Sequence, residues 1–152
     1  MSWTNVHLHS TIAHVLAIFE AIIGKFRARE SSRPLARHLK TGKSGEDRAA
    51  QYVRSLHYRI LGRNIRIGHD EIDLLAWDPA DRVLVFFEVK TRSHASEEYR
   101  PELGMTHEKK ARIQRAARRY VAQHDFSDGY RIDLLCVVAG QVVDHVRELS
   151  WE

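Results

Sequence analysis

EIDLLAW, residues 71–77, and RVLVFFEVK, residues 82–90, are two apolar runs on either side of DPAD at residues 78–81. Together the runs are rich in β-branched and aromatic side chains, and the segment between them has the Pro and Asp residues of a tight turn. This pattern predicts an antiparallel β-hairpin. Each run also carries charge at its end remote from the turn, where a buried strand usually avoids it.

The charged residues at these ends are Asp73, Glu88 and Lys90. A loop over residues 79–82 sets Asp73 opposite Glu88, with their Cβ atoms about 5 Å apart. Side chains alternate along a strand, so Lys90 lies on the same face as Glu88. A register shifted by one residue would put the two acids on opposite faces, so this prediction depends on the loop.

Paired carboxylates in a strand pair predict a site for a divalent cation. Buried like charges repel one another and lose hydration, and a cation removes both costs. Oxygen ligands favour Mg²⁺ or Mn²⁺, which can also take phosphate oxygens as ligands. Lys90 would then orient or help deprotonate a water, or stabilise charge on phosphorus. The alternative is a surface hairpin in which Glu88 pairs with Lys90 or a cross-strand arginine, but clustered unlike charges more often mark functional sites.

These residues resemble the active-site signature of a known nuclease superfamily. Asp73 followed by Glu88-Val89-Lys90 is similar to the signature of the PD-(D/E)xK nucleases. With Gly45-Glu46, Glu71–Leu74 and Phe87–Arg92, the chain resembles the YraN-like family of predicted bacterial nucleases, which is distantly similar to archaeal Holliday-junction resolvases. The resemblance implies an α/β, restriction-endonuclease-like fold with an αβββαβ core and a central mixed sheet.

The resemblance spans residues 41–148 and bears on two further positions. Glu46 matches the family's Gly-x-x-Gly-Glu pattern, and in nucleases of this superfamily an acid from the first helix can complete the metal site. A structural role for Glu46 has equal weight, because the helix dipole favours an acid in the first turn of a helix. Asp70 stands where the family commonly has glycine, a departure that would alter the approach to the site.

The composition fits one globular domain with an extension. The chain has 152 residues, of which 43% are hydrophobic and 29% charged, which is ordinary for a soluble protein with a core. Its formal net charge is +4, and residues 24–66 hold twelve Lys or Arg against three acids. This distribution predicts a polyanionic partner. The single cysteine, Cys136, excludes a disulfide framework and fits a reducing cytoplasm.

Residues 10–29 predict an amphipathic helix, because large apolar side chains recur there at helical spacing. Its apolar run is too short to span a bilayer and lacks the flanks of a secretory signal. Packing on the domain or on a partner protein is favoured over a peripheral membrane contact. Residues 1–40 are therefore expected to form this helix and a basic linker, and residues 41–152 the nuclease-like domain.

The remaining elements follow from periodicity and turn residues. The first helix of the domain is expected to begin with a capping box of Ser44 and Asp47, and a later helix with Thr106 as its cap. The expected elements are a helix over 44–57, a strand over 58–67 that completes an antiparallel meander with the hairpin, a polar loop over 91–104, a helix over 106–124, and strands over 130–138 and 142–149.

Basic residues crowd the exposed side of the helix over 106–124. Such a face is often merely solvated, but its cation density favours a surface that binds phosphates. The residues expected to bind nucleic acid are Arg92, Lys109, Arg112, Arg115 and Arg119. Asp133 lies in a local sequence similar to that of Asp73, but it has no partner Glu-x-Lys and is expected to be structural.

Three functions stay open on this sequence. The favoured one is a metal-dependent endonuclease that hydrolyses phosphodiester bonds in DNA, including branched or structured DNA. The second is a nucleic-acid-binding module that keeps the nuclease fold without turnover. The third is an adaptor on a membrane or another protein, through residues 10–29, and fold analogy cannot decide among them. RNA as the substrate and a homodimer as the assembly stay open as well.

Overall fold

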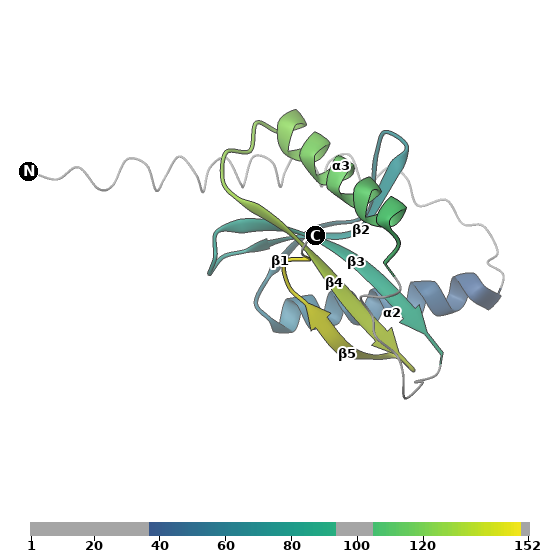
Figure 1. The fold of residues 1–152 in the computed structure, drawn as a ribbon. Coiled ribbons are helices and arrows are strands. Elements are labelled where there is room, and N and C mark those ends of the chain that lie inside the picture. The colour runs from purple at the N-terminus through teal and green to yellow at the C-terminus, as the bar shows by residue number, and fades with distance from the viewer. Residues whose placement is uncertain (1–36, 94–104, 150–152) are drawn as a thin grey trace, which may run out of the picture. The chain divides into compact units, whose positions relative to one another are not determined.

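The computed structural model describes residues 37–93 and 105–149, all within the unit Pro34–Glu152, with side chains from residue 44 onward. This part of the chain folds as an α/β domain with one five-stranded sheet and two helices (Figure 1). The elements are α2 (Arg37–Ser55), β1 (Arg59–Ile67), β2 (Asp70–Asp78), β3 (Val83–Arg92), α3 (His107–Gln123), β4 (Tyr130–Val138) and β5 (Gln141–Val146). The helix expected for residues 10–29 and most of the loop expected for residues 91–104 lie outside the described residues.

The strands lie in the sheet in the order of the sequence. β1, β2 and β3 form an antiparallel meander, β3 and β4 are parallel, and β5 pairs antiparallel with β4. The parallel pair needs a crossover connection, which contains α3. α2 and α3 cover opposite faces of the sheet (Figure 1). The predicted αβββαβ core with a mixed sheet is therefore confirmed.

The central hairpin has the predicted register. Trp77 pairs with Leu84, as a loop over residues 79–82 requires. The Asp78 side chain closes the turn, because its Oδ1 accepts a hydrogen bond from the Ala80 N–H at 3.0 Å. The alternation of side chains on β2 and β3 is thus the one from which the pairing of acids was predicted.

α2 begins earlier than predicted. It spans Arg37–Ser55, so Ser44 lies inside the helix and the expected capping box with Asp47 was wrong. The residues ahead of Ser44 are mostly good helix formers, so the helix continues through a position that resembles a cap. The first turn of α2 contains no acid. The helix-dipole explanation for Glu46 was therefore wrong.

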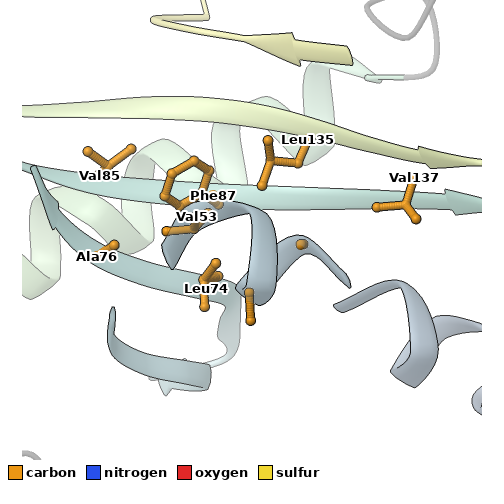
Figure 2. Packing of buried hydrophobic residues seen from close by; sticks show 9 residues of the cluster. Val53, Leu74, Ala76, Val85, Phe87, Leu135 and Val137 are labelled. Carbon is orange, nitrogen blue, oxygen red and sulfur yellow. The ribbon is translucent and has the colours of Figure 1, made fainter. Parts of the chain in front are cut away.

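A hydrophobic core lies between α2 and the sheet (Figure 2). Small and β-branched side chains on α2 let the helix lie close to the strands. The buried members of this core are Ala49, Ala50, Val53, Leu74, Ala76, Val85, Phe87, Leu135 and Val137. Because side chains alternate along a strand, the residues adjacent in sequence to Leu74 and Phe87 face α3 instead.

α3 packs on the other face of the sheet and begins at the predicted cap. The Thr106 side chain accepts a hydrogen bond from the Lys109 N–H at 3.2 Å. Tyr120 of α3 meets Phe86 of β3 edge to face, with ring centroids 5.7 Å apart. Neither α2 nor α3, the helices of the described ranges, is long and apolar enough to cross a membrane.

Candidate functional site

Asp73 and Glu88 lie where the paired part of the β2–β3 hairpin ends, on the face of the sheet that α3 covers. The backbone pairing runs as far as Leu74 and Phe87. Beyond it, the Asp73 Oδ2 accepts a hydrogen bond from the Val89 N–H at 2.7 Å. A side-chain carboxylate therefore takes the place of a strand carbonyl as the acceptor for this N–H. The two acids lie close enough for the charge of Glu88 to raise the pKa of Asp73.

Glu88 is a buried acid that lies between two lysines. Its side chain is 3% exposed. Lys109, from the first turn of α3, forms an ion pair with Glu88 Oε1, and Lys90 Nζ lies 3.8 Å from the same oxygen. This oxygen nevertheless accepts no hydrogen bond of good geometry from the described residues. The Lys109 ammonium is the direct partner of this buried oxygen, and a carboxylate so placed can exchange that partner for another cation.

Burial and crowding shift the protonation of these groups. Burial, and then the charge of Glu88, raise the pKa of Asp73 to about 7. Burial and the neighbouring Lys109 ammonium lower the pKa of Lys90. Burial also opposes the charge on Lys109, but its contact with Glu88 outweighs that effect and raises the pKa of Lys109. Shifted pKa values that cluster in this way are typical of functional sites.

The residues present fit a small divalent cation. Asp73 and Glu88 offer oxygen ligands only, and Mg²⁺ commonly takes one or two carboxylates together with waters and substrate phosphates. Glu88 Oε1, which contacts the Lys109 ammonium, is a suitable ligand atom. No group of three or more His, Cys, Asp or Glu side chains gathers around a possible metal position in the part of the chain that the structure describes. Asp73 and Glu88 are the candidate ligands among the described residues.

Glu46 lies near the pair without joining it. Its Oε2 accepts a hydrogen bond from the Asn64 Nδ2 of β1 at 3.0 Å. Its charge helps to raise the pKa of Asp73, behind the larger effects of burial and the paired acid. α2 approaches the end of β3 closely, because a side chain at Gly45 would overlap Thr91. This close approach brings Glu46 to the edge of the site.

The residues predicted to bind phosphates occupy different positions relative to the carboxylates. Lys109 lies at Glu88 itself, nearer to the acids than the sequence analysis expected. Arg112 and Arg119 are exposed on α3, and Arg92 is exposed at the end of β3. The signal that could have separated Lys109 from the arginines is its place in the first turn of a helix, where a cation is unfavourable.

Asp70 ties the β1–β2 turn to α3. The Nε and Nη2 atoms of Arg115 donate hydrogen bonds to the Asp70 carboxylate at 3.0 and 2.7 Å. These hydrogen bonds lower the pKa of Asp70. The sequence predicted nucleic acid as the partner of Arg115, and Asp70 was not expected to bind it. The pairing could not be seen in the sequence, because it depends on how α3 lies across the sheet.

A second buried polar cluster lies on the opposite face of the sheet and was not foreseen in full. Asp133 is fully buried, in agreement with a structural role. The Arg131 Nε donates to its Oδ2 at 3.1 Å, and the Arg131 Nη2 donates to Asp78 Oδ2 at 3.0 Å. His145 Nε2 lies 3.0 Å from Asp133 Oδ2, and the Glu148 N–H donates to Oδ1 at 2.9 Å. Both oxygens of Asp133 are therefore satisfied.

The chain forms an αβββαβ domain with Asp73 and a Glu88-x-Lys90 motif at the end of its central hairpin. The model of "Uncharacterised protein family UPF0102" matches residues 45–137. The chain therefore belongs to UPF0102, the YraN-like family that its sequence resembles.

Relatives in several bacteria support this membership. A UPF0102 protein of Oleidesulfovibrio alaskensis is 38% identical over 126 residues, which cover 82% of this chain and 61% of the relative. A UPF0102 protein of Nitratidesulfovibrio vulgaris is 43% identical over 103 residues, which cover 67% of this chain and 74% of the relative. The chain thus spans less than two thirds of the length of the first of these relatives.

Two solved structures are similar at a lower level. A repair endonuclease from Pyrococcus abyssi matches with a TM-score of 0.37 and 14% identity, over 73% of this chain and 41% of that one. The structure of an EndoMS-dsDNA2 complex matches with a TM-score of 0.36 and 20% identity, over 74% of this chain and 42% of that one.

Proposed function

We propose that this domain is a metal-dependent nuclease that hydrolyses phosphodiester bonds, with Asp73 and Glu88 as the ligands of Mg²⁺ or Mn²⁺. The observation that best supports this proposal is that Asp73 lies beside a second acid, the buried Glu88, so that burial and then the charge of Glu88 raise the pKa of Asp73 to about 7. A buried acid with a purely structural role is expected to be satisfied, as Asp133 is.

The acids of the site would hold the cation, and Lys90 would orient the groups that react. Asp73 is fixed by the Val89 N–H, so its carboxylate would need little rearrangement to act as a ligand. A divalent cation, when bound, would offset negative charge on the phosphate and acidify a water. Lys90 would donate hydrogen bonds to that water or to a phosphate oxygen as charge develops on it. Glu46, at the edge of the site, would be a further acidic partner.

The nucleic acid would follow the exposed side of α3 away from the carboxylates. Arg112 and Arg119 are seven residues apart, which places them on one side of the helix. Lys109 begins the same row at the site, and Arg92 adds an exposed cation at the end of β3. We propose DNA as the partner. Because most of these contacts would be to phosphates, affinity should fall steeply with salt.

The test is incubation with labelled linear, branched and single-stranded DNAs and RNAs in Mg²⁺, Mn²⁺ or EDTA. We expect cleavage with either cation, none in EDTA, and a loss of about a thousandfold in rate for Glu88→Gln and for Lys90→Ala. Lys90→Ala should still bind DNA. Asp125→Asn removes an exposed acid beyond the far end of α3 and should cleave as the wild type does. Normal cleavage by Lys90→Ala would remove the role proposed for this lysine.

An inactive protein that still binds DNA in a salt-dependent way would replace this proposal with the second function, a binding module that keeps the nuclease fold.

The cytoplasm remains the proposed location, because the single cysteine, Cys136, is buried in β4 and fits a reducing compartment. The adaptor function depends on residues 10–29, which lie outside the described residues.

A further inference from the structure

Lys109 occupies a position that the helix itself does not favour. It lies in the first turn of α3, where the positive end of the helix dipole disfavours a cation. Thr106 already satisfies its backbone N–H. Its side chain does not join the exposed arginines of α3 but reaches the buried Glu88, where its ammonium pairs with Oε1.

The proposed divalent cation and Lys109 need the same oxygen. Glu88 is 3% exposed, which restricts the directions from which its carboxylate can be approached. The Lys109 side chain is 33% exposed, so it has a route of withdrawal toward solvent. An ammonium and a divalent cation on one carboxylate oxygen would repel each other strongly in this buried setting.

We propose that Lys109 competes with the divalent cation for Glu88 Oε1, so that loading of the site displaces the Lys109 ammonium from Glu88. This inference rests on the proposed function, because it requires the cation site. In the empty site Lys90 and Lys109 face the two acids, and in the loaded site the cation takes the place of Lys109 at Glu88. Lys109 thus has two alternating partners: Glu88 when the cation site is empty, and the phosphates of a nucleic acid when the cation is bound.

Calorimetry with MnCl₂, in the absence of nucleic acid, tests the competition. Lys109→Met removes the competing charge and should tighten Mn²⁺ binding by about tenfold. Lys110→Met makes the same charge change one residue further along α3 and should alter the affinity by less than about twofold. Lys109→Gln keeps a polar side chain and replaces Lys109→Met in the experiment if the latter does not fold.

Acetylation of lysines, followed by mass spectrometry, tests the displacement in the wild-type protein. Saturating Mn²⁺ should raise the rate of Lys109 modification and leave that of Lys110 unchanged. A Lys109 that stays protected, or a Lys109→Met affinity that is equal to or weaker than the wild type's, would overturn the competition and leave the cation site in place. No Mn²⁺ binding by the wild type and Lys109→Met alike would overturn both.

Discussion

Residues 72–75 in β2 and residues 132–135 in β4 have the same sequence, Ile-Asp-Leu-Leu, and lie in the same sheet with different consequences. Asp133 faces α2 and is fully buried; both of its oxygens accept hydrogen bonds from Arg131, and Oδ1 also accepts one from the Glu148 N–H. Asp73 faces α3, accepts one hydrogen bond from a backbone N–H, and lies beside a second acid. The tetrapeptide therefore predicts the strand, and the partners decide what its acid does.

The two acids differ in whether a cation balances them directly: Arg131 donates hydrogen bonds to Asp133, whereas Asp73 receives its hydrogen bond from the Val89 N–H. Burial opposes the charge on Arg131, but Asp133 and its neighbours outweigh that effect, so the pKa of Arg131 lies above its usual range. The pKa of Asp73 is raised to about 7, by burial and then by Glu88. A buried acid that is directly paired with a cation stabilises the fold. A buried acid whose ionised form is disfavoured by its surroundings is typical of a functional site.

Breaking the balanced cluster should have the largest effect on stability. Asp133→Asn leaves Arg131 buried with a weaker partner, and we expect a loss of about 3 kcal/mol in the free energy of unfolding. Urea denaturation at neutral pH measures this loss. As a control, Arg147→Gln removes an exposed partner of Asp81 at the edge of the cluster and should cost less than about 1 kcal/mol. If Asp133→Asn were as stable as the wild type, the contrast between the two acids would not hold.

The same substitution at Asp73 should act in the opposite direction. The pKa of Asp73 is about 7 in the folded protein and has an ordinary value of 3.8, so the folded protein binds the proton more tightly than the unfolded chain does. The stability from this group is complete below about pH 4 and is lost as the pH rises through about 7. At pH 8 in EDTA, Asp73→Asn should therefore raise the free energy of unfolding by about 2 kcal/mol.

Urea denaturation between pH 4 and pH 8 measures this gain, which should shrink as the pH falls because the wild-type carboxyl group then becomes protonated. The matched control is Asp125→Asn, which replaces an exposed acid and should give the same stability as the wild type at both ends of the range. An Asp73→Asn protein that is less stable than the wild type at pH 8 would show that the carboxylate has a structural role.

The elements that depend on local chemistry could be predicted from the sequence. The turn over residues 79–82 determines the pairing of Trp77 with Leu84, and Thr106 caps α3 as expected. The start of α2 was mispredicted, because Ser44 has the chemistry of a cap but follows residues that form helix well. Local signals thus predicted which elements exist more reliably than where each begins.

The sequence predicted only those contacts of the site that lie within one hairpin. Asp73, Glu88 and Lys90 come together because a single turn controls their register. Lys109 and the Arg115 pair with Asp70 depend on the direction in which α3 crosses the sheet. A long-range packing direction of this kind is not encoded in periodicity or turn residues, so these contacts were missed.

The smallest effects concern the basic surface beside Asp73 and Glu88. Arg112 is exposed, whereas Arg115 is engaged by Asp70. Arg112→Gln should reduce the slope of log affinity against log salt by about 0.9 for the phosphate contact that is lost. Arg115→Gln should reduce it less. Fluorescence anisotropy with labelled DNA over a range of salt concentrations measures both slopes.

Arg118 offers the matched control for these arginines. It is also exposed on α3 but lies on a different side of the helix from Arg112. Arg118→Gln removes the same charge as Arg112→Gln. Because Arg118 lies outside the proposed phosphate-binding row, this substitution should leave the salt slope nearly unchanged. An equal reduction by Arg112→Gln and Arg118→Gln would contradict a directed phosphate-binding row and would leave only a general effect of net charge.

The measurement that tests the central claim most directly is calorimetric titration of Mn²⁺ into four proteins: the wild type, Asp73→Asn, Glu88→Gln and the control Asp125→Asn. If Asp73 and Glu88 form a cation site, the wild type and Asp125→Asn bind Mn²⁺ with equal affinity. The other two then bind it at least about tenfold more weakly. Equal Mn²⁺ affinity in all four proteins would contradict the claim, because the cation would then not use the carboxylates that distinguish β2 and β3 from β4.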